Sequence, residues 1–371
     1  MTQSIATDFS NIETFFTLVC VFGFSLGLTV LAVLLARKLA LKWGVVDIPG
    51  GRKKHDEPVP PVGGLAIFTV LLTCFAAVGS LYGISFPSAL LTALAITLIV
   101  GVIDDIREVD ARIKFAVHFL VAGILVIGGE AQIHTLGDLL GMGGMGLGWM
   151  AIPFSIACVV YIINAVNMMD GLDGLAAGNT LIIFIWFGLA AFLGDMSKPL
   201  MEIIIFCACL IGFLIFNARL PWNKHAKIFL GDAGSMGLGI MIAWYAITLS
   251  QNHNALIEPV SVAWIIALPI IDAFGLLVAR LKDKKPPFAP DRRHFHHHFI
   301  NAGFSVGPAV YTILAWSFIL GATGFVGTMV GIPQGILGWS WIVLWLLHAA
   351  MTIHHEKFIL LLAKLRGCRT S

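Results

Sequence analysis

The apolar stretch Ser88-Ala-Leu-Leu-Thr-Ala-Leu-Ala-Ile-Thr-Leu-Ile-Val-Gly-Val-Ile103 runs without a charge into the pair Asp104-Asp105. As an α-helix it is long enough to cross most of the ~30 Å apolar core of a bilayer. Similar stretches recur along the whole chain, so we predict an all-α integral membrane protein. Eleven spans can be counted, at residues 14–36, 62–81, 88–103, 114–130, 151–168, 175–194, 200–217, 235–250, 260–280, 306–330 and 336–353.

The composition supports this prediction and excludes an ordinary soluble domain. Hydrophobic residues make up 58% of the chain and charged residues only 12%. Residues 1–13 contain no Lys or Arg, so the first apolar stretch lacks the basic region of a signal peptide and is interpreted as a retained span. No linker or low-complexity tract interrupts the series. We therefore expect residues 1–371 to form a single membrane domain.

The basic residues are distributed unequally between the loops. When the loops are numbered alternately, 22 of the 23 Lys and Arg residues fall in one set and only Lys198 falls in the other. Basic loops stay on the cytoplasmic side of a membrane, so we expect the N-terminus outside and the C-terminus in the cytoplasm. The first set comprises Arg37, Lys38, Lys42, Arg52, Lys53, Lys54, Arg107, Arg112, Lys114, Arg219, Lys224, Lys227, Arg280, Lys282, Lys284, Lys285, Arg292, Arg293, Lys357, Lys364, Arg366 and Arg369.

Unusual polar residues gather at the expected cytoplasmic ends of the spans. Asp104 and Asp105 end the third span, and Lys114 follows them. Neighbouring carboxylates at a membrane boundary repel each other and lose solvation unless a cation or a metal compensates. The pair is suited to act as a general base, as a metal ligand or as a charge partner of Lys114. A hydrated, charge-paired helix end is the alternative.

A stripe of amides and carboxylates ends the fifth span, in the segment Asn164-Ala-Val-Asn167-Met-Met-Asp170-Gly-Leu-Asp173-Gly174. Steps of three residues keep side chains on one side of an α-helix, so at least Asn164, Asn167 and Asp170 should share a face. Amide and carboxylate oxygens are the ligands that Mg2+ prefers. Because polar groups beside a lipid-facing span are costly, we predict that they face a functional site.

A glycine-rich segment precedes the eighth span, with the sequence Phe229-Leu-Gly-Asp232-Ala-Gly-Ser235. The glycines allow a tight turn, and Ser235 is a candidate helix cap. Exposed N–H groups at a helix start favour phosphate. Asp232 would repel phosphate unless a divalent cation lies between them. The alternative is an ordinary capping Asp at a helix entrance.

A basic and histidine-rich run follows the ninth span, with the sequence Asp291-Arg292-Arg293-His294-Phe-His296-His297-His298. Arg and His side chains donate hydrogen bonds to phosphate, and Arg can do so with two at once. His294 and His298 also stand four residues apart, as zinc ligands can. The two Arg residues would repel a metal ion, so anion binding is favoured. Asp272, inside the ninth span, is expected to be functional or to pair with a cationic or polar neighbour.

Together these segments offer acidic metal ligands, glycine turns and basic phosphate donors at one membrane face. The combination suits phosphoryl transfer between a soluble nucleotide-diphosphate compound and a phosphate-bearing lipid. We expect the segments to converge and to hold one divalent ion against the diphosphate, where metal and cations stabilise the charge of the transition state. The rival hypothesis is an ion- or proton-coupled transporter, which predicts acids near the bilayer midplane and broken helices there. The acids instead gather at span ends, which favours the transferase.

In this order the motifs resemble those of the polyprenyl-phosphate N-acetylhexosamine-1-phosphate transferase superfamily over nearly the whole chain. The segment Pro290–Phe304 is most similar to its WecA branch, which uses UDP-GlcNAc. The resemblance implies that the phosphate of undecaprenyl phosphate attacks the β-phosphorus of UDP-GlcNAc, which forms GlcNAc-diphospho-undecaprenol and UMP and begins a surface polysaccharide. It also implies a bacterial cytoplasmic membrane protein with no nucleic-acid partner, and a homodimer is one expected assembly.

The resemblance further implies the residues that act. Asn167 and Asp232 would ligate Mg2+ or Mn2+. His298 extends the usual histidine pattern to the triple His of the branch that uses UDP-MurNAc-pentapeptide, so that substrate or another UDP-N-acetylhexosamine is the alternative. The other implied residues are Asp104 and Asp105 for the lipid phosphate, Lys114 for phosphate, Phe229 and Asp173 for uridine, Asp170 as a functionally sensitive position, and His294, His296 and His297 for diphosphate or sugar. Asn164, Arg292 and Arg293 complete the candidate substrate-binding residues.

Overall fold

The computed structural model describes residues 12–47, 58–251, 257–286 and 291–366. Arg52, Lys53, Lys54, Pro290 and Arg369 lie outside the described residues, as do residues 1–11. The helices are α1 (Ile12–Trp43), α2 (Gly63–Tyr82), α3 (Ser88–Ile106), α4 (Ala111–Gly123), α5 (Ala151–Met169), α6 (Leu175–Leu193), α7 (Ser197–Asn217), α8 (Gly231–Ser250), α9 (Pro259–Ile265), α10 (Ala267–Lys282), α11 (Phe295–Asn301), α12 (Val306–Met329), α13 (Gln334–Ile353) and α14 (His355–Leu365), with short helical turns η1 (Ile124–Gly128) and η2 (Gly148–Met150).

Within those ranges all the regular elements are helices, and β-structure is limited to isolated bridges such as Asp47–Val59. In the described residues ten helical segments, α1 to α8 with α12 and α13, are long and apolar enough to cross a membrane, where α4 is counted together with η1. The bent pair α9–α10 makes eleven if it forms one span. These helices correspond to the eleven stretches predicted from the sequence. The protein is therefore an all-α, multi-pass membrane protein.

The ninth predicted span is broken. α9 and α10 meet at an angle of 75°, whereas the sequence indicated one span at 260–280. Pro269 explains the break, because it has no backbone N–H and its ring clashes with the carbonyl group four residues earlier. That carbonyl belongs to Ile265, the last residue of α9.

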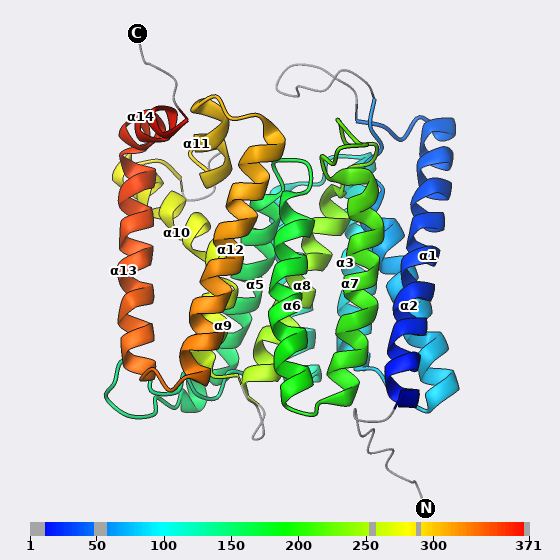
Figure 1. Ribbon diagram of the computed structural model, residues 1–371, viewed down its shortest axis with the longest axis horizontal. Helices are drawn as coiled ribbons and strands as arrows, with labels where there is room; N and C mark the ends of the chain where they lie inside the picture. The colour runs from blue at the N-terminus through cyan, green and yellow to red at the C-terminus, as the bar shows by residue number, and fades with distance from the viewer. Residues whose placement is uncertain (1–11, 48–57, 252–256, 287–290, 367–371) are drawn as a thin grey trace, which may run out of the picture.

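The interior is built around α8, which lies behind α6 in Figure 1 and packs against α2, α3, α5 and α6. Almost all of its residues are buried. Two glycines let neighbouring helices approach its first turn. A Cβ added at Gly64 would lie 2.2 Å from the Cα atom of Gly234, and a Cβ added at Gly101 would lie 2.2 Å from the Cα atom of Ala233. The backbones of α2 and α3 therefore touch the start of α8.

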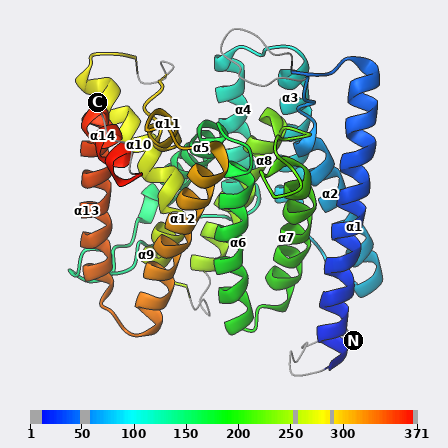
Figure 2. The same cartoon turned by 45° about the horizontal axis from the view of Figure 1, so that its top comes forward.

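The motif-bearing segments gather at one end of the bundle. In Figure 1 this is the upper end, where α11 and α14 lie, and α1 begins at the opposite end. Figure 2, which brings that end forward, shows α11 close to the end of α5. The carboxyl ends of α3 and α5 and the amino end of α8 are joined there by hydrogen bonds.

Candidate active site

The amino end of α8 is capped by a carboxylate from another helix. Asp105, in the last turn of α3, accepts hydrogen bonds from the backbone N–H groups of Asp232 (2.7 Å) and Ala233 (3.3 Å). Gly231 has a φ of +75°, and a Cβ there would lie 2.6 Å from a carboxylate oxygen of Asp105. Ser235 is not the cap, because it lies inside the first turn. Asp105 thus takes up the N–H groups of Asp232 and Ala233, two of the groups at this helix start that the sequence indicated as candidates for phosphate binding.

A lysine lies between two carboxylates at the same point. The ammonium group of Lys114, in the first turn of α4, is 2.8 Å from Asp104 and 3.2 Å from Asp232. Asp104 is buried, and it also accepts a hydrogen bond from the backbone N–H of Val109 (2.7 Å). The positive charge of Lys114 therefore compensates the repulsion between these carboxylates.

α5 joins the group through one amide. Asn167 donates hydrogen bonds to Asp232 (3.1 Å) and to the hydroxyl group of Ser235 (2.8 Å). Four helices thus contribute to one hydrogen-bonded group around Asp232. We call the set Asp104, Asp105, Lys114, Asn167 and Asp232 the carboxylate cluster.

Asp170 lies directly after α5 and is exposed. Desolvation by the surrounding protein, followed by the negative charges of Asp232, Asp105 and Asp173, raises the pKa of Asp170 to about 7. Because the side chain remains exposed, charge repulsion is the firmer of these causes. A cation bound among these carboxylates would lower the pKa again.

Asn164 was predicted to share a helix face with Asn167, but its hydrogen-bond partners are different. Its amide nitrogen donates to the carbonyl of Val160 (2.8 Å) and lies 3.2 Å from His118. The other ring nitrogen of His118 lies 3.1 Å from the sulfur of Met236. Asn164 and buried His118 therefore link α5, α4 and α8 beside the cluster.

The residues expected at the uridine end lie in two neighbouring segments. Phe229 is half-buried, and its backbone is paired with Pro60 and Gly63 (both 2.9 Å). Asp173 accepts a hydrogen bond from Arg219 at 2.8 Å. Sequence reasoning missed Arg219, for which the only signal was its place among the basic loops.

An apolar cavity of about 400 Å³ begins at the Asp173–Arg219 pair. It runs between α6, α7 and α12, and residues such as Leu181, Leu214 and Leu314 line it. The ion pair therefore forms the polar end of a largely apolar space.

The histidine run is held by Asp272, which is buried in α10. One carboxylate oxygen lies 3.0 Å from Nδ1 of His294, and the other accepts from the backbone N–H of Phe295 (2.9 Å). His348 of α13 lies 3.5 Å from the same carboxylate. The expectation that Asp272 pairs with a polar neighbour is met. The pairing fixes the first turn of α11.

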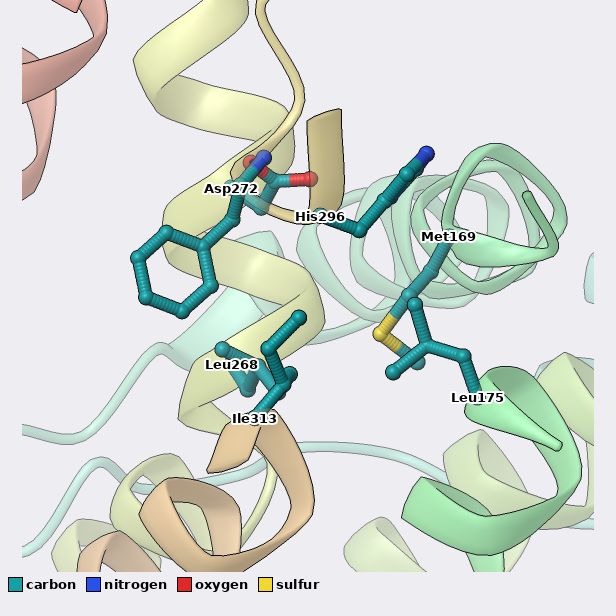
Figure 3. A pocket seen from close by; sticks show the side chains of 7 residues that line it. Met169, Leu175, Leu268, Asp272, His296 and Ile313 are labelled. Carbon is teal, nitrogen blue, oxygen red and sulfur yellow. Dashed lines mark hydrogen bonds between the residues drawn. The ribbon is translucent and has the colours of Figure 1, made fainter. Parts of the chain in front are cut away.

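His296 connects this run to the end of α5. A Cβ at Gly171 would lie 2.4 Å from Nε2 of His296, so the ring rests against the glycine backbone. Figure 3 shows His296 and Asp272 beside a small cavity of about 10 Å³, lined also by Met169 and Leu175. Burial, and then the neighbouring His297 and His294, lower the pKa of His296 to about 3. His296 is therefore neutral near pH 7.

The two arginines of the histidine run differ in their exposure and in their ion pairs. Arg293 donates to both oxygens of Asp291 (2.9 and 2.7 Å) and lies 2.8 Å from Asp283. Although burial opposes it, Arg293 lowers the pKa of Asp291 to about 2. Arg292 is exposed, and His297 is half-buried with a pKa lowered first by burial and then by His294. Arg292 and His297 are thus more accessible to an anion than Arg293.

The donor set suits a hard cation that arrives with a phosphate ligand. Within the described ranges, no group of three His, Cys, Asp or Glu side chains is arranged to hold a metal alone. Mg2+ usually takes only one or two carboxylates and completes its shell with water and substrate phosphates. Asp232 and Asn167 are oxygen donors of that kind. Lys114 already places positive charge between Asp104 and Asp232.

Comparisons with known proteins identify the family of this chain. Residues 87–250 match the model of Glycosyl transferase family 4. An undecaprenyl-phosphate alpha-N-acetylglucosaminyl 1-phosphate transferase of Yersinia pestis is 31% identical over 321 residues, which is 86% of each chain. The chain belongs to glycosyl transferase family 4. The segment matched by the family 4 model contains the whole carboxylate cluster, and the histidine run lies beyond it.

Two further relatives of this family 4 chain have similar names. A probable undecaprenyl-phosphate N-acetylglucosaminyl 1-phosphate transferase of Bacillus subtilis is 32% identical over 81% of this chain and 82% of its own. The undecaprenyl-phosphate alpha-N-acetylglucosaminyl 1-phosphate transferase of Escherichia coli K12 is 29% identical over 86% and 85%.

Proposed function

We propose that this family 4 enzyme transfers GlcNAc-1-phosphate from UDP-GlcNAc to undecaprenyl phosphate, giving GlcNAc-diphospho-undecaprenol and UMP. The observation that carries the proposal is the carboxylate cluster, in which Asp105, Lys114 and Asn167 from three helices all contact Asp232. The names of the relatives support the choice of sugar and of acceptor lipid.

The reaction is a displacement at phosphorus. An oxygen of the lipid phosphate bonds to the β-phosphorus of UDP-GlcNAc, and the bond from this phosphorus to the bridging oxygen of UMP breaks. UMP leaves with that oxygen, and the C1–O bond of the sugar stays intact. We favour direct displacement over a covalent aspartyl intermediate.

The chain's own residues bind and orient the reacting groups. Asp104 orients or deprotonates the lipid phosphate, and Lys114 binds phosphate beside it. Asp105 fixes the first turn of α8 and thereby the backbone of Asp232. When bound by Asn167 and Asp232, Mg2+ or Mn2+ supplies positive charge against the diphosphate. Asp170 adds a further carboxylate at the edge of the cluster.

The donor substrate is bound on both sides of the cluster. Phe229 stacks on uracil and Asp173 contacts the uridine end, where Arg219 holds its carboxylate. His294, His296 and His297 bind diphosphate or sugar, with Asp272 holding His294. Arg292 and Asn164 are secondary contacts, and Arg293 can bind substrate only if it releases Asp291.

The cluster end of the bundle faces the cytoplasm in this proposal, with the N-terminus outside and the C-terminus inside. The support is the positive charge of the loops at that end. Residues 1–371 act as one membrane domain in the bacterial cytoplasmic membrane, and the product primes a surface polysaccharide.

Two alternatives remain distinguishable. The first is the same reaction with another UDP-N-acetylhexosamine or with UDP-MurNAc-pentapeptide as donor, for which the triple histidine ending in His298 is the supporting feature. The broken α9–α10 span is a feature that the transporter hypothesis also predicts. Against transport, the linked acids of the carboxylate cluster lie at helix ends, and Asp272, inside α10, is engaged by His294.

The test is UMP release by purified protein with undecaprenyl phosphate and Mg2+. UDP-GlcNAc, UDP-GalNAc and UDP-MurNAc-pentapeptide are compared side by side, with Asp232→Asn as the inactive control. We expect metal-dependent release with UDP-GlcNAc as the preferred donor. Release from another donor alone would change the assigned substrate. No release from any donor, together with solute uptake by vesicles, would overturn the proposal.

A further inference from the structure

The last described helix lies at the point where a span leaves the membrane. α13 ends at Ile353 and α14 begins at His355, so only His354 separates them. α13 is long and apolar enough to cross the bilayer. In Figure 1, α14 lies across the end of α13 and next to α11. The position of α14 at the membrane surface therefore follows from the span to which it is attached.

One face of α14 covers the helix that carries the histidine run. Leu362 is buried in the cluster of apolar residues shared with α11. The ring of Phe358 stacks on Phe295 with centroids 6.3 Å apart, and it meets the ring of His298 edge-on at 5.5 Å. α14 thus supports the residues on either side of His296 and His297.

A second contact closes the carboxyl end of this pair of helices. Arg366, directly after α14, donates a hydrogen bond to the carbonyl of Gly303. Its guanidinium group also lies over the ring of Phe304, 5.9 Å from the centroid. A displacement of α14 would therefore move α11.

Another face of α14 is apolar and uncovered. Leu361 is 53% exposed and Leu365 is 75% exposed. They are four residues apart, so they lie on the same side of the helix. Lys357 and Lys364 are exposed beside them. Leu360 is equally exposed (51%), but it points about 100° away from Leu361, toward the side of Glu356.

We propose that α14 is an interfacial helix that binds the bilayer surface and thereby holds α11 in its active position. Leu361 and Leu365 insert at the boundary of the acyl chains, and Lys357 and Lys364 contact anionic phosphate headgroups. A basic, amphipathic helix fixed to a span fits a lipid surface, because its cations and apolar side chains match headgroups and acyl chains. The effect on α11 rests on the proposed function; the binding of α14 to lipid does not.

The first experiment measures lipid contact with two neighbouring leucines as a matched pair. Leu361→Cys and Leu360→Cys are made in a Cys20→Ser/Cys368→Ser background and placed in nanodiscs containing phosphatidylglycerol. A water-soluble maleimide is added, and labelling is normalised to unfolded protein. We expect Leu361→Cys to react about tenfold more slowly than Leu360→Cys, because only Leu361 faces the acyl chains. Equal rates would overturn the interfacial placement.

The second experiment tests the coupling to α11. UMP release is compared in phosphatidylglycerol and phosphatidylcholine nanodiscs for the wild type, for Lys357→Gln/Lys364→Gln and for the control Lys282→Gln/Lys284→Gln. We expect faster release in phosphatidylglycerol for the wild type and the control, and no such difference for the α14 variant. Equal release by the wild type in both lipids would overturn the coupling. Absence of UMP in every lipid would refute the proposed function, while the labelling result would still decide the lipid contact.

Discussion

The contact between Asp272 and His294 gives the sharpest prediction. Asp272→Asn keeps the side-chain volume but removes the charge. The new amide has one oxygen for two donors, Nδ1 of His294 and the backbone N–H of Phe295. If the oxygen of the new amide accepts from the backbone N–H of Phe295, its N–H₂ group faces Nδ1 of His294. Two donors cannot pair, so the imidazole of His294 must take the other tautomer or rotate away. The variant therefore disturbs one imidazole and leaves the backbone of α11 bonded.

The expected size follows from the bond that is lost. A hydrogen bond to a charged group contributes ~1.5–3 kcal/mol. If all of it is needed to orient His294 in the transition state, kcat for UMP release falls about 10- to 150-fold. Asp272→Ala should lower stability by ~1–3 kcal/mol for each buried donor that it leaves unpaired.

The assay is UMP release with variable UDP-GlcNAc, together with thermal unfolding in detergent. His348→Gln is the matched control, because His348 contacts the same carboxylate at 3.5 Å from a different helix. We expect the control to stay close to wild type. Asp272→Asn that unfolds at the wild-type temperature and keeps kcat within about twofold would refute the reasoning, since one tenfold step corresponds to ~1.4 kcal/mol.

Three other variants and conditions are expected to separate roles within the site. Asp232→Asn should abolish UMP release without lowering the unfolding temperature in detergent, and near-normal release would remove Asp232 from the metal site. Phe229→Ala should raise KM for the UDP-sugar, because stacking on a base contributes ~1–3 kcal/mol, and an unchanged KM would argue against stacking. Burial lowers the pKa of His296 to about 3 and that of His298 to about 4, below the ~6.5 of an unfolded chain. The unfolded state then binds more protons, so stability is complete above pH ~6.5 and is lost as the pH falls toward 4. In thermal unfolding, His298→Leu should make this loss shallower, and an identical slope would contradict a neutral, buried His298.

Some features of the site could be predicted because they are local. Polar residues and glycines directly beside apolar spans identify two segments, Asn167–Asp173 and Phe229–Ser235. The partners of these residues could not be predicted. Arg219 and Arg293 look alike as loop cations, yet each is engaged by a carboxylate, Asp173 or Asp291, that the sequence alone does not select.

The sequence by itself determined the all-helical, multi-pass architecture. In a membrane each segment must satisfy its backbone hydrogen bonds internally, so length and local composition are sufficient to predict the spans, apart from the break between α9 and α10. Only the tertiary structure decided that Asp105 caps α8, that Lys114 lies between Asp104 and Asp232, and that Asp272 holds His294. These contacts join residues up to 127 positions apart along the chain. They depend on how closely helix backbones approach, as at Gly101 against Ala233, which no local pattern records.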